Sequence, residues 1–303
     1  MTRMYDGPII DAHTHLWDLS MDAHPWLRPA DGAVQALGGL DAIRRTFVVE
    51  DYLRDAARQP IAASVHVEAL WDPADPVGET RWLEGLDKSR CIAARYVGAA
   101  PFGTPGAAAV IEAQAAFDRM AGLRAIFSFH PGQPAKNFAA RDGLARDPAW
   151  RADIARLPPL GLALEAMLYP YQAADVADLA RSLPDLRIVV NHCASPVDRD
   201  AAGMARWRDA VVRLAAEPNV MIKVSNAEAY DPDPGEDSLR AVQRHCIESF
   251  GPDRSILATD WPVARLTGGF DAICDRFRRT VADFGAAEQR AMFHDNALRL
   301  YRL

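Results

Sequence analysis

The stretch "RSLPDLRIVV" (residues 181–190) runs from the end of a helical pattern, through a proline, into a short run of apolar residues. The stretch "AAEPNVMIKV" (residues 215–224) repeats the same passage. Proline does not continue a helix, and a short run rich in Val and Ile is typical of a buried strand. The two stretches therefore predict successive β-α units.

Apolar runs of this kind occur eight times, separated by stretches with Ala, Leu, Arg and Glu at helical spacing. The predicted strands are 9–15, 61–68, 91–99, 123–130, 161–168, 187–193, 220–226 and 255–261. The predicted helices are 76–88, 107–120, 148–156, 173–183, 204–216, 238–250 and 270–284. No glycine-rich nucleotide-binding motif follows an early strand, which disfavours an open doubly wound sheet. The pattern predicts an α/β fold, a (β/α)₈ TIM barrel that forms one domain over residues 1–303.

The connection after the first predicted strand is unusual. It runs from Trp17 to about Asp51, is rich in Trp, Pro and Gly, and lacks a clear helical pattern. Long connections within a compact domain are usually functional, so we predict that this loop borders a ligand pocket.

Composition excludes several classes of function. The 303 residues include 34 basic and 41 acidic side chains without long runs of one sign, and the net charge is −7, so we expect no nucleic-acid partner. No apolar stretch reaches the roughly 18 residues that span a bilayer. The four cysteines are too widely spaced for a C-x-x-C site or a disulfide scaffold. We expect a cytoplasmic protein with a small-molecule substrate and no membrane partner. The sequence is compatible with either a monomer or a homo-oligomer.

The ends of the predicted strands carry the residues with catalytic chemistry. In a β/α barrel the active site lies at the C-terminal ends of the strands, and residues two apart on a strand face the same side. In "IIDAHTHLWDL" (9–19) this rule places His13 and His15 together on one face. Such a pair can ligate a divalent metal, but it can also serve only in hydrogen bonds within a core.

Two further strand ends favour the metal interpretation. His192 ends the sixth strand in "VVNHC", and Asp260 ends the eighth in "LATDW". A barrel would bring both over the same cavity as the histidine pair. In that arrangement a metal can polarise a carbonyl group while Asp260 takes a proton from water.

Other strand ends supply candidates with two possible roles. Glu165, Lys223 and His130 are predicted to bind substrate, although each could instead form a structural ion pair or hydrogen bond. Arg124 near the start of the fourth predicted strand could point to the barrel floor and pair with Asp11. Among the aromatic residues just past strand ends, we predict substrate contacts for Trp17 and Tyr169. The others could wall the pocket or only pack: Trp26, Trp71, Tyr171 and Trp261.

These motifs resemble the amidohydrolase superfamily, and within it the amidohydrolase 2 group of TIM-barrel metal-dependent hydrolases, which includes sugar lactonases and pyrone dicarboxylate lactonases. The resemblance runs almost end to end, through "IIDAHTHLWDLSMDAHPWL", "HVEALWDPADPVGETRWLEGL", "GLRAIFSFHP", "IVVNHCASP", "NVMIKVSN", "LATDWPV" and "HDNALRLYRL".

The resemblance implies an enzyme that hydrolyses lactones at a site centred on His13, His15, His192 and Asp260. By the same resemblance Asp260 is the general base, His192 a further catalytic residue, Glu68 an additional metal ligand, and Arg124 a substrate-binding residue. It implies a divalent metal, with zinc the expected ion, although the group also includes members that need no metal.

Two positions depart from the pattern of the group. Asn226 in "KVSN" stands where relatives typically have Gly, and Tyr171 in "YPYQ" stands where they often have His. Both lie beside the expected pocket, so they bear on substrate identity more than on reaction type.

Three hypotheses of function follow. The first is a metal-assisted hydrolase that opens a lactone of a sugar acid or a related carboxylated ring compound, with Asp260 activating water. The second is a non-oxidative, metal-dependent decarboxylase of the same superfamily, which would release carbon dioxide. The third is a non-catalytic barrel that binds a small molecule.

Overall fold

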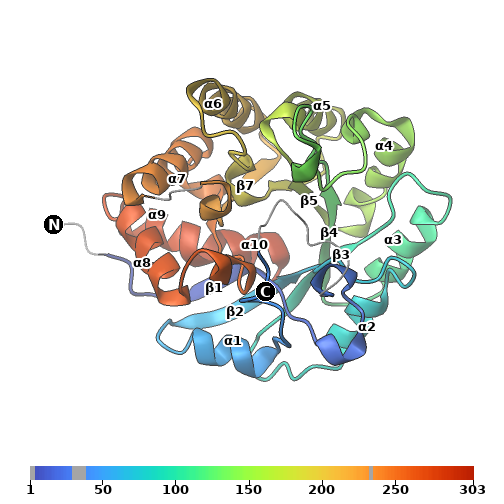
Figure 1. The fold of residues 1–303 in the computed structure, drawn as a ribbon, viewed down its shortest axis with the longest axis horizontal. Helices are drawn as coiled ribbons and strands as arrows, with labels where there is room; N and C mark the ends of the chain where they lie inside the picture. The colour runs from blue at the N-terminus through green and yellow to red at the C-terminus, as the bar shows by residue number, and fades with distance from the viewer. Residues whose placement is uncertain (1–3, 29–38, 232–234) are drawn as a thin grey trace.

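Eight parallel strands form the centre of the molecule (Figure 1). The computed structural model describes residues 4–28, 39–231 and 235–303. The strands are β1 Ile9–Thr14, β2 Ile61–Val67, β3 Arg95–Ala99, β4 Met120–Ile126, β5 Ala163–Met167, β6 Ile188–Val190, β7 Val220–Val224 and β8 Ser255–Leu257. Each strand pairs in parallel with the next along the chain. Every predicted strand is therefore present, and the predicted order is confirmed.

The sheet closes on itself just beyond β8. The backbone N–H of His15 donates to the carbonyl of Trp261 at 2.8 Å, and the N–H of Asp260 donates to the carbonyl of His13 at 2.9 Å. These bonds join the end of β1 to the segment after β8. The fold is a TIM barrel, as predicted, and its closure brings Asp260 beside the histidine pair.

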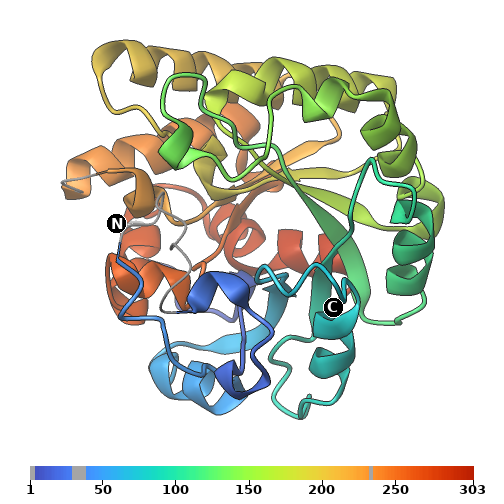
Figure 2. The same ribbon diagram turned by 45° about the vertical axis from the view of Figure 1, so that its right-hand side comes forward.

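Helices surround the strands (Figures 1 and 2). They are α1 Val49–Asp55, α2 Gly78–Glu84, α3 Ala107–Ala115, α4 Pro148–Ile154, α5 Ala173–Ser182, α6 Ala201–Ala215, α7 Glu236–Phe250, α8 Phe270–Thr280, α9 Ala286–Arg290 and α10 Asn296–Tyr301. Each of the seven predicted helical segments overlaps one of these helices, although α6 and α7 begin three and two residues before the predicted starts at 204 and 238. In the described part of the chain, no helix is long and apolar enough to cross a membrane.

The last helix, α10, closes the barrel at the N-terminal ends of its strands. Arg95, at the start of β3, donates to the carbonyl of Tyr301 at 3.2 Å, and Arg187, just before β6, donates to the carbonyl of Leu300 at 3.1 Å. Side chains of α10 join those of the strands in the core inside the barrel, together with Val65, Val97 and other residues. The C-terminal ends of the strands lie at the opposite end of the barrel, where α10 does not cover them and a site can form.

The structure differs from the prediction at the fourth strand. β4 begins at Met120 and ends at Ile126, whereas the predicted segment was 123–130. The chain leaves the sheet after Ile126, and the carbonyl of Ser128 instead accepts hydrogen bonds from the backbone of Phe138 and Ala139. Arg124 therefore lies in the C-terminal half of its strand, and the prediction that it points to the barrel floor is wrong.

The long first connection contains two short 3₁₀ turns, Leu19–Met21 and Pro25–Leu27, before α1 begins at Val49. Residues 29–38 of this predicted loop lie outside the described residues.

Candidate active site

His13, His15 and Asp260 form a buried cluster at the C-terminal end of the barrel. One ligand atom from each lies within 4.8 Å of the others. Nε2 of His15 is 3.0 Å from Oδ1 of Asp260, and Nε2 of His13 is 3.4 Å from the same oxygen. Two imidazoles and a carboxylate are a donor set that zinc and other divalent metals accept.

The hydrogen bonds of His15 fit a cation between its ring and Asp260. Nδ1 of His15 lies 2.7 Å from the carbonyl oxygen of Val67, which can only accept, so Nδ1 carries the proton. In a ring that carries this one proton, Nε2 presents its lone pair to the carboxylate of Asp260 at 3.0 Å. Two electron-rich atoms at that distance repel unless a proton or a metal ion lies between them.

His13 is also suited to bind a cation. It is completely buried, and its Nε2 has no hydrogen-bond partner. Burial lowers the pKa of His13 well below its usual value, and the nearby ammonium of Lys223 lowers it further. A neutral ring with a free nitrogen is the form of histidine that ligates metals.

Asp260 is held in position from two sides. Beyond its contact with His15, its Oδ2 accepts a hydrogen bond from Nδ2 of Asn226 at 2.6 Å. Burial alone would raise the pKa of Asp260, but His192 and the contacts with His15 and Asn226 outweigh burial and lower the pKa below its ordinary value. Asp260 is therefore ionised at neutral pH and oriented to accept a proton.

His192 lies in an unusual backbone segment after β6. Residues 192 to 195 have positive φ angles of 49°, 55°, 55° and 45°, a left-handed conformation that is costly for residues other than glycine. The indole N–H of Trp207 donates to the carbonyl of Cys193 at 2.7 Å and helps to fix this turn. Nδ1 of His192 is hydrogen-bonded to Oγ of Ser225 at 3.0 Å. Burial lowers the pKa of His192 to about 4, so the ring is neutral.

Lys223 and Glu165 form an ion pair inside the barrel. Nζ of Lys223 is 2.7 Å from Oε1 of Glu165, and both side chains are fully buried. Glu165 also accepts hydrogen bonds from Asn191 and from the hydroxyl of Tyr301 in α10. Nζ of Lys223 lies 3.5 Å from Nδ1 of His13, at the limit of a hydrogen bond. The structure thus places these two predicted substrate-binding residues beneath His13, outside the lining of the cavity.

Arg124 and Glu68 form a second buried pair. The guanidinium of Arg124 binds Oε1 of Glu68 and also donates to its backbone carbonyl at 2.9 Å. Oε2 of Glu68 accepts from the backbone N–H of Leu70 at 2.8 Å. Both oxygens of Glu68 therefore have partners, and the structure does not bring this predicted metal ligand into the cluster of His13, His15 and Asp260.

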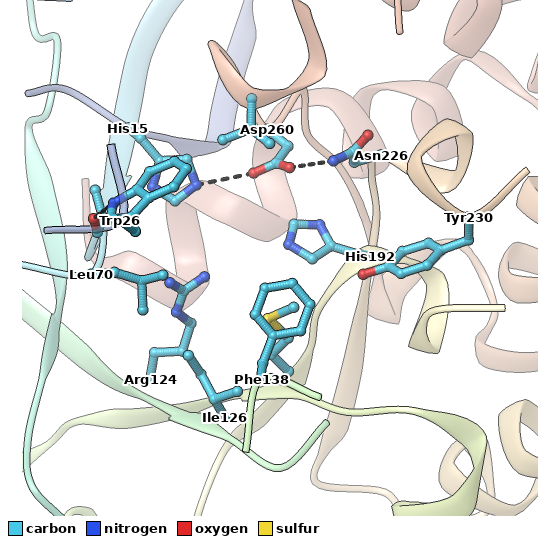
Figure 3. Close-up of a pocket in the computed structure, with 13 residues that line it drawn as sticks. His15, Trp26, Leu70, Arg124, Ile126, Phe138, His192, Asn226, Tyr230 and Asp260 are labelled. Carbon is cyan, nitrogen blue, oxygen red and sulfur yellow. Dashed lines mark hydrogen bonds and ion pairs between the residues drawn. The ribbon is translucent and has the colours of Figure 1, made fainter. Parts of the chain in front are cut away.

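A cavity opens above the cluster, with an empty volume of ≈ 530 Å³ that includes space open to solvent (Figure 3). Its polar lining consists of His15, Arg124, His192, Asn226, Tyr230 and Asp260. The remaining lining is apolar, and Figure 3 shows Phe138, Ile126 and Leu70 opposite Asp260.

Other predicted substrate-binding residues lie outside this cavity. Nε2 of His130 is 2.9 Å from Asp198, which also accepts from the hydroxyl of Tyr171 at 2.7 Å. Tyr169 donates to the carbonyl of Lys136 at 2.6 Å and lines a neighbouring hollow. Trp17 is fully buried, and its indole N–H donates to the carbonyl of Arg45 at 2.6 Å. The structure brings none of these three predicted residues to the cavity wall.

Tyr230 and Asn226 are cavity residues to which sequence reasoning assigned no role in the site. Both follow β7, in "KVSNAEAY". The sequence drew attention to Asn226 only because relatives typically have glycine at that position. Its backbone has φ of 40°, where glycine is unstrained, yet asparagine tolerates this region better than most residues. The amide of Asn226 provides a hydrogen bond to Asp260 that glycine could not.

We expect Asn226→Gly to lower kcat about tenfold, because a hydrogen bond to a charged group contributes roughly 1.5–3 kcal/mol and only part of it is specific to the transition state. The melting temperature should hardly change, since glycine relieves the left-handed backbone. Steady-state kinetics and thermal denaturation measure the two effects. Cys91→Gly, at another left-handed position with φ of 54°, is the matched control. An unchanged kcat in Asn226→Gly would show that this bond does not assist Asp260.

Several known proteins are similar to this chain over almost its whole length. A family model described as amidohydrolase matches residues 10–303. Uncharacterized protein y4mH of Sinorhizobium fredii is 35% identical over 301 residues, which cover 99% of this chain and 100% of that protein. An L-fucono-1,5-lactonase of Burkholderia ambifaria is 29% identical, covering 97% of this chain and 95% of that enzyme. A crystal structure of a zinc-bound amidohydrolase from Burkholderia multivorans superimposes with a TM-score of 0.80 at 21% identity, covering 98% of this chain and 100% of that one.

Proposed function

The chain belongs to the amidohydrolase family, and on that premise we propose that it hydrolyses lactones, with lactones of sugar acids or related carboxylated ring compounds as its substrates. The curated lactonase from Burkholderia ambifaria supports the reaction type. The observation that carries the proposal is the buried, ionised Asp260, held between His15 and Asn226 at the wall of a cavity.

In the proposed reaction Asp260 accepts a proton from a water molecule as the water oxygen bonds to the lactone carbonyl carbon. The bond between that carbon and the ring oxygen then breaks, and protonated Asp260 gives its proton to the departing oxygen. The product is one open chain with a hydroxyl group and a carboxylic acid, and the acid releases its proton to solvent to become a carboxylate.

His192 is placed to assist at the carbonyl oxygen. When Oγ of Ser225 donates to Nδ1, the proton of the neutral ring lies on Nε2, which can donate to an oxygen that gains negative charge. The low pKa of His192, a result of burial, keeps the ring neutral through the physiological range. We therefore propose His192 as a catalytic residue, and Arg124 as a residue that binds substrate.

His13, His15 and Asp260 would hold a divalent ion, for which we propose zinc. When bound, such an ion supplies Lewis acidity toward the carbonyl and lowers the pKa of water. The free Nε2 of His13 and the lone pair of His15 directed at Asp260 support this assignment. The zinc-bound structure from Burkholderia multivorans also supports it.

We expect His13→Asn to lose bound zinc, since the variant removes one of three clustered donors while keeping a similar volume. Elemental analysis after dialysis should find about one zinc ion per wild-type chain and a small fraction of that in the variant. His245→Asn, at a histidine outside the cluster, should retain the metal. Equal zinc content in all three proteins would place the ion elsewhere.

A hydrolysis screen on the purified protein tests the activity itself. Sugar δ-lactones, simple δ-lactones and pyrone carboxylates would be assayed by acid release, with and without added zinc or manganese. Release of carbon dioxide from aromatic acids, with no lactone opened, would support the decarboxylase instead. Tight binding of a lactone without turnover at any metal concentration would support a binding protein.

A further inference from the structure

A second hollow lies beside the cavity, over the C-terminal ends of β2, β3 and β4. We call it the side chamber. Its empty volume is ≈ 1100 Å³, part of it open to solvent. Thirteen of its sixteen lining residues are apolar, including four prolines and the aromatic residues Trp26, Trp71, Phe102 and Trp150. An apolar hollow of this kind suits a group that leaves water readily.

The side chamber adjoins the catalytic cavity. Four residues line both: Trp26, Leu70, Arg124 and Ile126. These four residues form the boundary between the two, so a molecule whose reacting part lies beside Asp260 would reach the chamber by passing between them. The shared boundary places the chamber next to the proposed position of the substrate.

The charged groups in the chamber wall are already paired. Arg124 binds Glu68, and Glu79 contacts Nε2 of His66 at 3.0 Å and accepts from the backbone N–H of Ala69 at 2.9 Å. These are the three lining residues that are not apolar. A polar sugar side chain would find few free partners here, so an apolar group fits better.

The aromatic walls are held in place by their own contacts. The indole N–H of Trp26 donates to the carbonyl of Ala69 at 2.7 Å, and Trp71 stacks on Trp82 with ring centroids 6.3 Å apart. Trp150 packs against Phe102 at 5.6 Å. A preformed chamber loses little conformational entropy when it is filled.

We propose that the side chamber binds an apolar substituent, alkyl or aryl, on the lactone whose ring opens beside Asp260. This inference rests on the proposed lactonase activity, and it moves the expected substrate from sugar lactones, whose substituents are polar, to lactones that carry an apolar substituent. The reacting ring occupies the polar cavity, and the substituent passes Leu70 and Ile126 into the chamber.

A substituent series on the wild-type enzyme tests the inference directly. The substrates are δ-valerolactone and its derivatives with a methyl, propyl or pentyl group on the carbon next to the ring oxygen, with D-glucono-1,5-lactone as a polar comparison. Each fully buried methylene is worth roughly a fourfold gain in binding. We expect kcat/KM to rise about tenfold or more from the methyl to the pentyl derivative, and the glucono-lactone to be a poorer substrate than the pentyl derivative.

A variant that fills the chamber localises the effect. Ala100→Trp adds a bulky side chain to the chamber wall at a residue that does not line the cavity. We expect it to abolish most of the preference for the pentyl over the methyl derivative. Ala74→Trp, at an exposed position on the loop after β2, is the matched control and should keep that preference. If Ala100→Trp does not fold, the substituent series on the wild-type enzyme still tests whether an apolar substituent raises kcat/KM.

The outcomes separate the two proposals. If no lactone is hydrolysed under any condition, the proposed function fails. If lactones are hydrolysed with equal kcat/KM whatever the substituent, or with a preference for the glucono-lactone, the function stands and the side-chamber inference is overturned. If Ala100→Trp dissociates an oligomer and leaves the preference intact, the chamber is an interface with a second copy, and the inference is likewise overturned.

Discussion

Asp260→Asn is expected to reduce kcat/KM for the lactone by about a thousandfold or more while the protein remains folded. General acid-base catalysis by a placed side chain contributes 10²–10⁴-fold, and Asn cannot accept the proton of the attacking water. Asn is nearly isosteric with Asp, and it tolerates the left-handed backbone at this position, where φ is 61°. The fold should therefore persist.

The test needs kinetics, metal analysis and thermal denaturation on the same preparation. Asp55→Asn is the matched control, because Asp55 contacts Trp261 and Arg265 in the same loop but does not line the cavity. If Asp260→Asn retains zinc and loses turnover, Asp260 acts in the proton transfer. Turnover close to that of the wild type would exclude Asp260 as the general base.

The fold could be predicted from the sequence because the alternation of apolar runs and helical stretches is local and repeated. The eight strands and their order follow from that alternation together with the preference for parallel β-α units. The position of Arg124 was harder to predict. The apolar run before it has no sharp start, so the predicted strand began three residues late, at 123 and not 120. Because of that shift, the sequence placed Arg124 at the barrel floor, whereas in the structure it lies at the cavity wall.

The cluster of His13, His15 and Asp260 could be predicted because strand ends converge in a barrel. The partner of each side chain could not, since it depends on contacts between strands distant in sequence. The resemblance implied that Glu68 is a metal ligand, whereas in the structure Arg124, from two strands away, binds its carboxylate. His130 was likewise predicted to bind substrate, whereas in the structure its Nε2 contacts the carboxylate of Asp198.

Lys223→Met is expected to destabilise the protein by about 3–5 kcal/mol, because it leaves the carboxylate of Glu165 buried without its cation. The pKa of Lys223 is lowered by burial, and the carboxylate of Glu165 counteracts this effect. The loss should appear as a fall in melting temperature on the order of 10 °C. Denaturant titration would give the free energy of unfolding directly.

The double variant Lys223→Met with Glu165→Gln separates a structural pair from a substrate contact. It removes both charges, and a glutamine at 165 can still accept from Tyr301, while Oδ1 of Asn191, which has no partner now, could accept from its amide. Replacing a whole buried ion pair is often nearly neutral, so we expect the double variant to regain most of the lost stability. If Lys223 instead bound substrate, Lys223→Met would raise KM and leave stability unchanged, and the second substitution would restore nothing. The full burial of both side chains beneath His13 argues for the structural pair, whose role is then to hold the floor of the site rigid under the histidines.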